Sequence, residues 1–291
     1  MVAAIMTGLI GLNTAVVQAA VITNIWTGST SSAVDNNENW SGYKNPLGYA
    51  VTPDDLGDTH IGVINGNGTT APVISWGGQI NNTVLTVNNS AVITQTSALN
   101  TVGVTLTLNN NVAYNAGANI VLIGSATTAS TLTINDSATL GAFYIQIGKA
   151  AQGIVNQNGG SVTLTNLQLG VGTPAATASR YNFSAGSLAV ETGFYFGASD
   201  AGTDGGTYFN FTEGSTGTFT ILADNFDFAK HINAGRIRYN DTKYSATDSI
   251  WSIDTSVAGQ TTLSMVPEPR GISLVFFGTA GIMFIRNKIL E

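Results

Sequence analysis

ANIVLIGSATTASTLTINDSATL (residues 118–140) and AFYIQIGKAAQGIVNQNGGSVTL (residues 142–164) are neighbouring segments of the chain that share one design. Each opens with an alternating apolar strand that closes at a glycine, and each continues with a second strand and a polar turn. Residues 166–190 and 193–221 repeat this arrangement. The four closing glycines follow one another at nearly equal steps and are Gly124, Gly148, Gly172 and Gly197. Internal repetition therefore dominates the middle of the chain.

The repeats predict an all-β fold, a parallel β-solenoid (β-helix) with coils of about 24 residues. Leu, Ile, Val or Phe alternate with Thr, Asn or Ser, so one side of each strand enters a core and the other meets solvent. Because one coil cannot bury its own inner side, successive coils must stack. Shorter copies occur at residues 84–93 and 105–114. An antiparallel sandwich is the alternative, but the nearly constant repeat spacing favours the solenoid.

The composition limits the classes of protein to which the chain can belong. Of its 291 residues, 43% are hydrophobic and only 9% are charged, and 34 are glycine. A surface so poor in charge stays soluble through Asn, Thr, Ser and Gly, which is common in elongated extracellular β proteins. With a formal charge of −7, the chain lacks the excess of basic residues that is typical of a protein that binds nucleic acid. The chain has no cysteine, which excludes disulfides and Cys-ligated zinc.

Residues 20–80 are expected to form an N-terminal capping region with the first coils. A solenoid needs its first coil covered so that the open strand edge does not recruit other chains, and Trp26 and Trp40 suit that role. The sharper alternative is a carbohydrate platform made of Trp26, Trp40 and Tyr43, because aromatic rings also bind sugars. Capping is the preferred interpretation, since large aromatic side chains are usually buried.

Residues 81–223 are assigned to the solenoid repeats, and residues 224–265 to a small C-terminal α/β cap. Within the cap, DNFDFAKHINAG predicts a helix that Asp224 caps and Gly235 ends. The following RIRYND predicts a strand. Lys230 and His231, both on the helix, are expected to face solvent.

The repeats give little evidence of an enzymatic active site. Many β-helical proteins are polysaccharide lyases or hydrolases, which need clustered carboxylates together with Arg or Lys. Between residues 119 and 221 the charged side chains are scattered, one or two per coil. Histidine occurs only at His60 and His231, so a His-dependent triad is not expected and a multi-histidine metal site is excluded.

Two acidic turns raise the question of calcium. Carboxylates occur in PDDLGDT (Asp54, Asp55 and Asp58) and in DAGTDGG (Asp200 and Asp204). Neither turn has the spacing of an EF-hand loop or of a calcium-binding nonapeptide repeat. We interpret both as exposed, Gly-rich turns, and we predict no metal site, no cofactor and no catalytic residue.

The N-terminus predicts export. MVAAIMTGLIGLNTAVVQAA is apolar and ends in small residues, which predicts a secretory signal peptide over residues 1–19, cleaved after Ala19 or Ala20. A buried first strand or helix is the alternative for this segment.

The C-terminus has a distinctive order of elements. The apolar run from Gly271 to Ile285 contains 15 residues and spans about 22 Å as a helix, against roughly 30 Å of hydrocarbon in a membrane. Two prolines break any structure before the run, and two basic residues follow it. A breaker, a short apolar helix and a basic end are typical of a sorting signal.

The tail at residues 266–291 resembles the PEP-CTERM sorting signal of exported proteins of Gram-negative bacteria. The matching motif residues are Val266, Pro267, Glu268, Pro269, Arg286 and Lys288. The resemblance implies that a short transmembrane helix holds the precursor transiently in the inner membrane. It also implies processing near Pro-Glu-Pro by an exosortase, a membrane-embedded cysteine transpeptidase-like enzyme.

A second resemblance lies near the N-terminus, where WTG, NWSG and P…GDT…ING resemble the opening of secreted β-solenoid proteins with autotransporter-associated-type repeats. Together the two resemblances imply an exported, non-catalytic structural or surface-interaction protein, at the cell surface or in an extracellular polysaccharide or biofilm matrix. The implied partners are the exosortase-type enzyme and extracellular polysaccharide, and no nucleic acid is expected. The alternatives are a β-helix polysaccharide lyase or hydrolase and a cell-surface adhesin.

Overall fold

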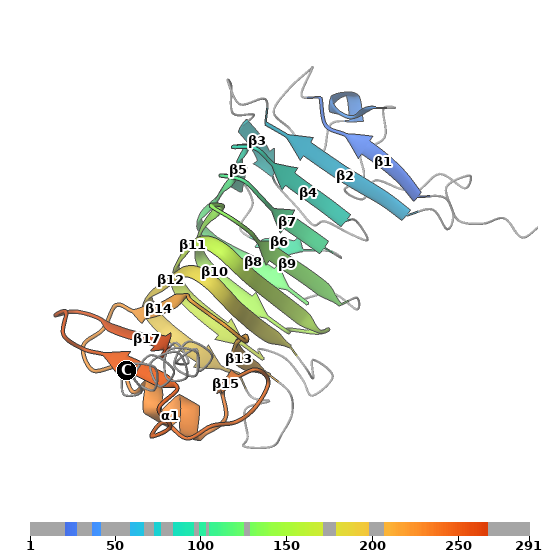
Figure 1. Cartoon of the computed structure of the whole chain (residues 1–291). Coiled ribbons are helices and arrows are strands. Elements are labelled where there is room, and N and C mark those ends of the chain that lie inside the picture. The colour runs from blue at the N-terminus through green and yellow to red at the C-terminus, as the bar shows by residue number, and fades with distance from the viewer. Residues whose placement is uncertain are drawn as a thin grey trace, which may run out of the picture.

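The computed structural model confirms the parallel β-solenoid. It describes residues 21–27, 37–41, 59–66, 73–76, 84–95, 99–102, 105–124, 129–170, 179–197 and 207–266. Strands from successive turns stack along one axis, and the N-terminal and C-terminal turns lie at opposite ends of the stack (Figure 1). Successive turns are about 26 residues apart, slightly more than predicted.

The coil has three sides, each a parallel sheet that we call the first, second and third face. The first face contains β1 (Val21–Ile25), β2 (Thr59–Asn65), β4 (Val84–Asn88), β7 (Thr105–Leu108), β9 (Ser130–Ile134), the first parts of β11 (Gly153–Leu169) and β12 (Arg180–Phe196), β13 (Tyr208–Phe211) and β15 (Ile237–Tyr239). The sheet order follows the chain order of the turns, as stacking requires.

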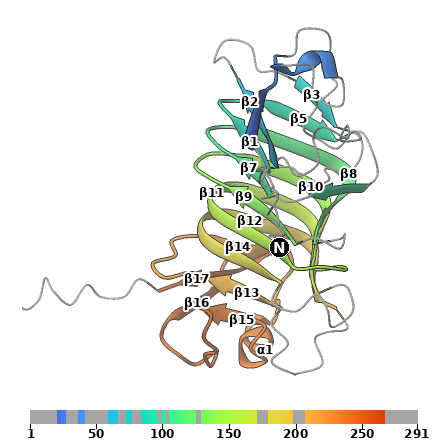
Figure 2. The ribbon, with the colours of Figure 1, turned by 90° about the vertical axis from the view of Figure 1, so that its right-hand side faces the viewer.

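The other two faces are built from the strands that follow in each turn. The second face contains β3 (Val73–Trp76), β5 (Val92–Gln95), the first parts of β8 (Ala113–Ile123) and β10 (Thr139–Ile147), the middle parts of β11 and β12, and β14 (Thr218–Ile221). The third face contains β6 (Leu99–Val102) and the ends of β8, β10, β11 and β12. Among the described residues, all three faces are present in about five turns, and the first face continues beyond them at both ends. Figure 2 shows the stack from the side.

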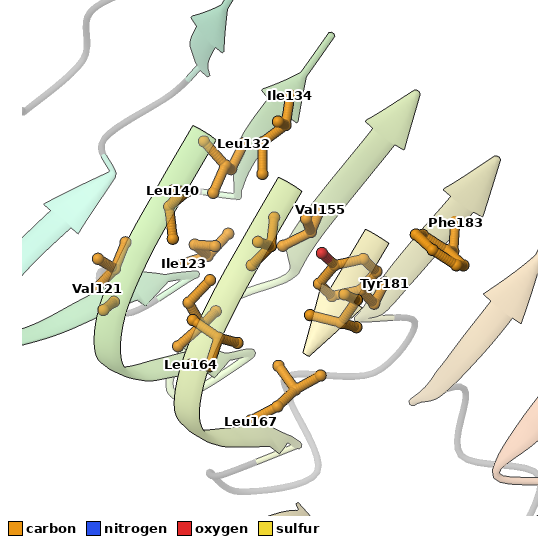
Figure 3. Packing of buried hydrophobic residues seen from close by; sticks show 14 of the residues in the cluster. Val121, Ile123, Leu132, Ile134, Leu140, Val155, Leu164, Leu167, Tyr181 and Phe183 are labelled. Carbon is orange, nitrogen blue, oxygen red and sulfur yellow. The ribbon is translucent and has the colours of Figure 1, made fainter. Parts of the chain in front are cut away.

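Inward side chains form buried rows along the solenoid axis. One row on the first face consists of Leu85, Leu106, Leu132, Val155, Tyr181 and Phe209, each in register with the next and none exposed. Burial of each such side chain stabilises the fold by about 1.5–3 kcal/mol. Figure 3 shows how side chains from the faces meet in one core. The core changes along the axis from aliphatic to aromatic, and Phe183, Phe194, Phe211 and Phe219 pack around Phe209.

The predicted alignment of the closing glycines needs one correction. The third-face ladder pairs Ile147 with Leu169 and Leu169 with Phe196, so Gly170 is the counterpart of Gly148 and Gly197. The N–H of Gly170 donates to the carbonyl of Ile147, and that of Gly197 donates to the carbonyl of Leu169 (both 2.8 Å). The second of these two steps along the chain is therefore longer than the first. Equal spacing wrongly pointed to Gly172, which lies outside the described residues.

Five asparagines stack at the corner between the first and second faces. In chain order they are Asn65, Asn88, Asn109, Asn135 and Asn158. From Asn88 onward, each Nδ2 donates to the Oδ1 of the asparagine one turn before it, over 2.7–2.9 Å. A side-chain amide can donate and accept at once, so every inner member of this ladder bonds in both directions. The polar turns of successive coils are therefore stacked at this corner.

The asparagine ladder gives a stability prediction. Asn109→Ala removes two ladder bonds and leaves the neighbouring amides of Asn88 and Asn135 unmatched, so we expect a loss of about 1–2 kcal/mol in the free energy of unfolding. Asn65→Ala removes one bond at the ladder end and should cost about half as much. Urea unfolding curves with unchanged slope would measure both. Equal effects of the two variants would contradict the ladder as a source of stability.

The C-terminal cap contains the predicted helix and strand. Helix α1 (Phe228–Asn233) is followed by Gly235, whose N–H donates to the carbonyl of Ile232, and then by β15. The helix is capped by Asp227, which accepts from the N–H of Lys230 at 2.9 Å, and not by Asp224. Asp224 instead accepts from the N–H of Gly259 at 2.6 Å, because the last hairpin folds back against it.

That hairpin closes the second face. Strand β17 (Thr261–Met265) pairs antiparallel with β14, and β16 (Trp251–Asp254) pairs with β17. An antiparallel hairpin in this place ends the parallel ladder of coils, so the edge of β14 is covered.

The two polar side chains of α1 differ in their surroundings. Lys230 is exposed, as predicted. His231 is only partly exposed, and its ring stacks on Phe226 (centroids 5.4 Å apart, planes 3° apart) and lies near Phe194. The prediction that His231 faces solvent is therefore corrected, because this turn of α1 lies against the aromatic end of the core.

The export signals lie outside the described residues, which include neither residues 1–19 nor the tail beyond Val266. Among the residues that are described, no helix has the length and apolar character needed to cross a membrane.

Candidate functional site

The outer side of the first face carries an ordered row of neutral polar residues. Its members occupy the same position in six successive turns: Thr86, Thr107, Thr133, Asn156, Asn182 and Asn210. The asparagines are bonded along the row, at 2.8 Å from Asn182 to Asn156 and at 3.2 Å from Asn210 to Asn182. Asn210 is buried, and the other five members are partly exposed. The row up to Asn182 therefore presents hydroxyl and amide groups in successive turns and no charge.

A small charged cluster lies at the C-terminal end of the first face. The Tyr208 hydroxyl donates to Asp241 at 2.8 Å and accepts from the Arg180 guanidinium at 3.2 Å, and Arg180 and Asp241 are 3.5 Å apart. The Arg238 guanidinium lies 4.0 Å above the Tyr208 ring. Burial, followed by the hydrogen bond to Asp241, raises the pKa of the Tyr208 hydroxyl. A neutral phenol held between these two groups joins the turns and is not poised as a base.

The described part of the chain holds no group of three or more His, Asp or Glu side chains that could bind a metal ion. The charged cluster has one carboxylate, whereas glycoside hydrolysis needs two that face each other across the bond. Among the described residues, this cluster therefore offers ion pairing and packing between turns.

The outer side of the third face is different, because it combines amides with aromatic rings. We call it the amide–aromatic strip and define it by Phe143, Tyr144, Gln146, Asn166, Gln168 and Tyr195. Tyr144 is in register with Asn166, and Gln146 is in register with Gln168 and then with Tyr195. The Nε2 of Gln146 donates to the Oε1 of Gln168 at 3.2 Å. The strip thus spans three successive turns, and none of its side chains is charged.

The ring of Tyr195 lies over Gly193, which has no side chain. A side chain at position 193 would point the same way as Tyr195, and its Cβ would come within 2.1–2.3 Å of three atoms of the Tyr195 ring and hydroxyl. Since glycine has no Cβ, the ring occupies that place and rests along the sheet. Tyr195 nevertheless remains 46% exposed. The Tyr195 side chain therefore covers Gly193 and is at the same time partly open to solvent.

Phe143 and Tyr144 form the other end of the strip. Their rings meet edge to face with centroids 5.3 Å apart, and Phe143 is 40% exposed. Leu122 precedes Gln146 in its row and is buried, which bounds the open strip on the N-terminal side. Asn166, between Tyr144 and Gly193 in register, is also largely buried.

The aromatic residues proposed as a carbohydrate platform are placed differently. Trp26 and Trp40 face each other through an isolated antiparallel bridge, beside the short helical turn Asn37–Asn39. Trp40 is only 2% exposed and belongs to the core, and Trp26 packs against that core. Both tryptophans therefore take part in packing at the N-terminal end of the core. Tyr43 lies outside the described residues.

The other predicted functional residues are those of the sorting signal. Val266 is described and 41% exposed, and its N–H donates to the carbonyl of Ile250 at 2.9 Å. Pro267, Glu268, Pro269, Arg286 and Lys288 lie outside the described residues.

A signal for the strip is present in the sequence, although the strip was not among the predicted sites. The aligned ends of three repeats read YIQIG, NLQLG and GFYFG, and their outward positions are Tyr and Gln, Asn and Gln, and Gly and Tyr. When the three ends are aligned, the second outward position reads Gln, Gln and Tyr, but only the strand register shows that these three residues are neighbours across the sheet.

Comparisons with protein-family models, curated proteins and solved structures find no match to this chain. The fold and its outer surfaces are therefore the basis for assigning a function.

Proposed function

We propose that this chain is an exported, non-catalytic β-solenoid that serves as a structural or surface-interaction component of an extracellular polysaccharide matrix. In this proposal, an exosortase-type enzyme processes the PEP-CTERM-like tail after export. The observation that carries the proposal is the set of uncharged polar rows along the outside of the coils, of which Thr86, Thr107, Thr133 and Asn156 form one.

These rows suit a polymeric ligand. A polysaccharide offers many hydroxyl groups along its length, and each hydrogen bond to a surface hydroxyl or amide contributes little by itself. Many weak contacts on one rigid scaffold add up, because the second and later contacts form at high effective concentration. A stacked solenoid holds its side chains at a fixed spacing, so little ordering is needed when the ligand binds.

The export part of the proposal is tested by intact mass of the protein from culture medium and envelope of its native host. We expect loss of the residues up to Ala19 or Ala20 and loss of the tail after about Pro269. Deletion of the exosortase should restore the tail and leave the N-terminal cleavage unchanged. A tail that stays intact while the exosortase is present would show a plain membrane anchor and overturn the sorting proposal.

The same host tests the matrix location. Protein held by neutral contacts should remain with the isolated polysaccharide at about 1 M salt, where the Debye length falls to about 3 Å. Digestion of the polysaccharide should release it. Release by salt alone would show that charge holds the protein, and absence from the matrix fraction would contradict the matrix role.

A further inference from the structure

We infer that the amide–aromatic strip of the third face is a binding site for one class of ligand, a neutral polysaccharide with β-linked, mostly equatorial sugar units. This inference rests on the proposed function, because it assumes that the protein meets polysaccharide outside the cell. It goes further by naming the face, the residues and the chemistry.

The first support is the state of the Tyr195 ring. The ring lies in the place that a side chain at Gly193 would take, and Tyr195 remains 46% exposed. A sugar with equatorial hydroxyls has an apolar C–H face, and such a face packs well on a flat aromatic ring. Because the ring stands at the surface of the strip, it is available for such a contact.

The second support is the pair of glutamines beside the ring. Gln146 and Gln168 are bonded to each other, which orients both amides, and both side chains are partly exposed. Each amide has two N–H donors and an oxygen with two lone pairs, so one mutual bond leaves capacity for sugar hydroxyls. Stacking on the ring and hydrogen bonding at its edge can thus act on the same sugar unit.

The third support is the distance between the two tyrosines of the strip. Tyr144 and Tyr195 lie two strands apart across the sheet and are offset by two positions along it. Strand spacing and residue rise then place their Cα atoms roughly 12 Å apart. This separation suits a chain of several sugar units that crosses the three turns, with the glutamines between the two rings.

The charge pattern selects a neutral polysaccharide over an acidic one. None of the six strip residues is charged, and the formal charge of the whole chain is −7. Glu191, at the corner before Gly193, accepts from the Thr165 hydroxyl at 3.1 Å and adds negative charge to this side. An anionic polymer would meet repulsion here and no cation within the strip.

The test measures binding of the purified, processed protein by calorimetry. The probes are three neutral β-linked hexasaccharides (cellohexaose, laminarihexaose and mannohexaose) and the acidic polymer polygalacturonate. The wild type should bind at least one neutral probe and bind polygalacturonate much more weakly. Tyr195→Ala should weaken binding about tenfold or more, which corresponds to about 1.4 kcal/mol, and Tyr195→Phe should stay within about threefold because the ring remains.

Gly193→Val tests the geometry without removing the ring. The added side chain should tilt Tyr195 off the sheet and weaken binding as strongly as Tyr195→Ala. The first-face control replaces Thr107 and Thr133 by alanine and leaves the strip intact. These threonines belong to the polar row of the proposed function, so the variant measures the contribution of that row, and we expect it to weaken binding of the hexasaccharides less than Tyr195→Ala does. Circular dichroism of every variant confirms that the fold is retained.

Four outcomes would overturn the inference. They are absence of binding to all three neutral probes, equal binding to polygalacturonate, loss of binding only in the first-face control, and self-association through the strip that Tyr195→Ala abolishes. If the first-face control alone loses binding, the proposed matrix function survives and only the choice of face fails. If the wild type binds no probe, the processing and matrix fractionation experiments still decide the proposed function.

Discussion

Gly160→Ala is expected to destabilise the solenoid by about 3–5 kcal/mol, which is one of the two largest effects that we predict for a single substitution. Gly160 has φ +66°, and a Cβ at this position would stand 2.0 Å from the carbonyl oxygen of Ala138 in the preceding turn. That carbonyl accepts the N–H of Ser161 at 3.0 Å, so the added methyl group forces apart a bond between turns. Backbone strain and steric overlap therefore act together.

Gly214→Ala separates these two causes. Gly214 has almost the same backbone angle, φ +69°, but its Cβ would meet nothing within 4 Å. We expect a loss of about 1–2 kcal/mol from backbone strain alone. Denaturant unfolding midpoints of both variants give the comparison. Equal losses would show that the turns can move apart at this corner and that close stacking does not require glycine there.

Phe209→Ala is expected to cost about 4 kcal/mol of unfolding free energy. Phe209 is fully buried and stacks between Tyr181 (centroids 5.1 Å apart) and Phe219 (4.8 Å apart). Both neighbours belong to different strands, so the cavity cannot close by a simple shift of one side chain. The loss should lower the midpoint of chemical unfolding. Probes of the C-terminal turns should change at a lower denaturant concentration than in the wild type.

The matched control for this substitution is Phe143→Ala. It removes the same atoms from a side chain that is 40% exposed and contacts Tyr144 at its edge. We expect a loss of about 1 kcal/mol or less. If Phe209→Ala costs no more than the control, the aromatic end of the core does not stabilise the solenoid.

The sequence by itself determined the parallel stacking and the direction in which most side chains point. In a strand the side-chain period is two, so the alternation in TLTL or STLTI decides which residues are buried before any coil is built. Repetition at a nearly constant period then requires equal strands to lie above one another. For this reason the burial of Leu106, Leu108, Leu132 and Ile134 follows from the sequence.

Only the tertiary structure decided the three-sided coil and the alignment of the closing glycines. Along the third face, the step from Ile147 to Leu169 is shorter than the step from Leu169 to Phe196, so constant spacing could not identify Gly170. The choice of the residue that caps α1 was also decided by the tertiary structure. Asp224 and Asp227 are both good capping residues, and the hairpin that brings Gly259 to Asp224 comes from far along the chain.

The candidate site also depended on the tertiary structure. Gln146, Gln168 and Tyr195 belong to three different turns, and they are neighbours across the sheet only through a register that the sequence does not state. The absence of a side chain at Gly193 acquires its meaning only once Tyr195 lies over it. Alternation along one strand is a local property that a sequence shows directly, whereas neighbours across strands are set by how the turns close, and the structure alone provides them.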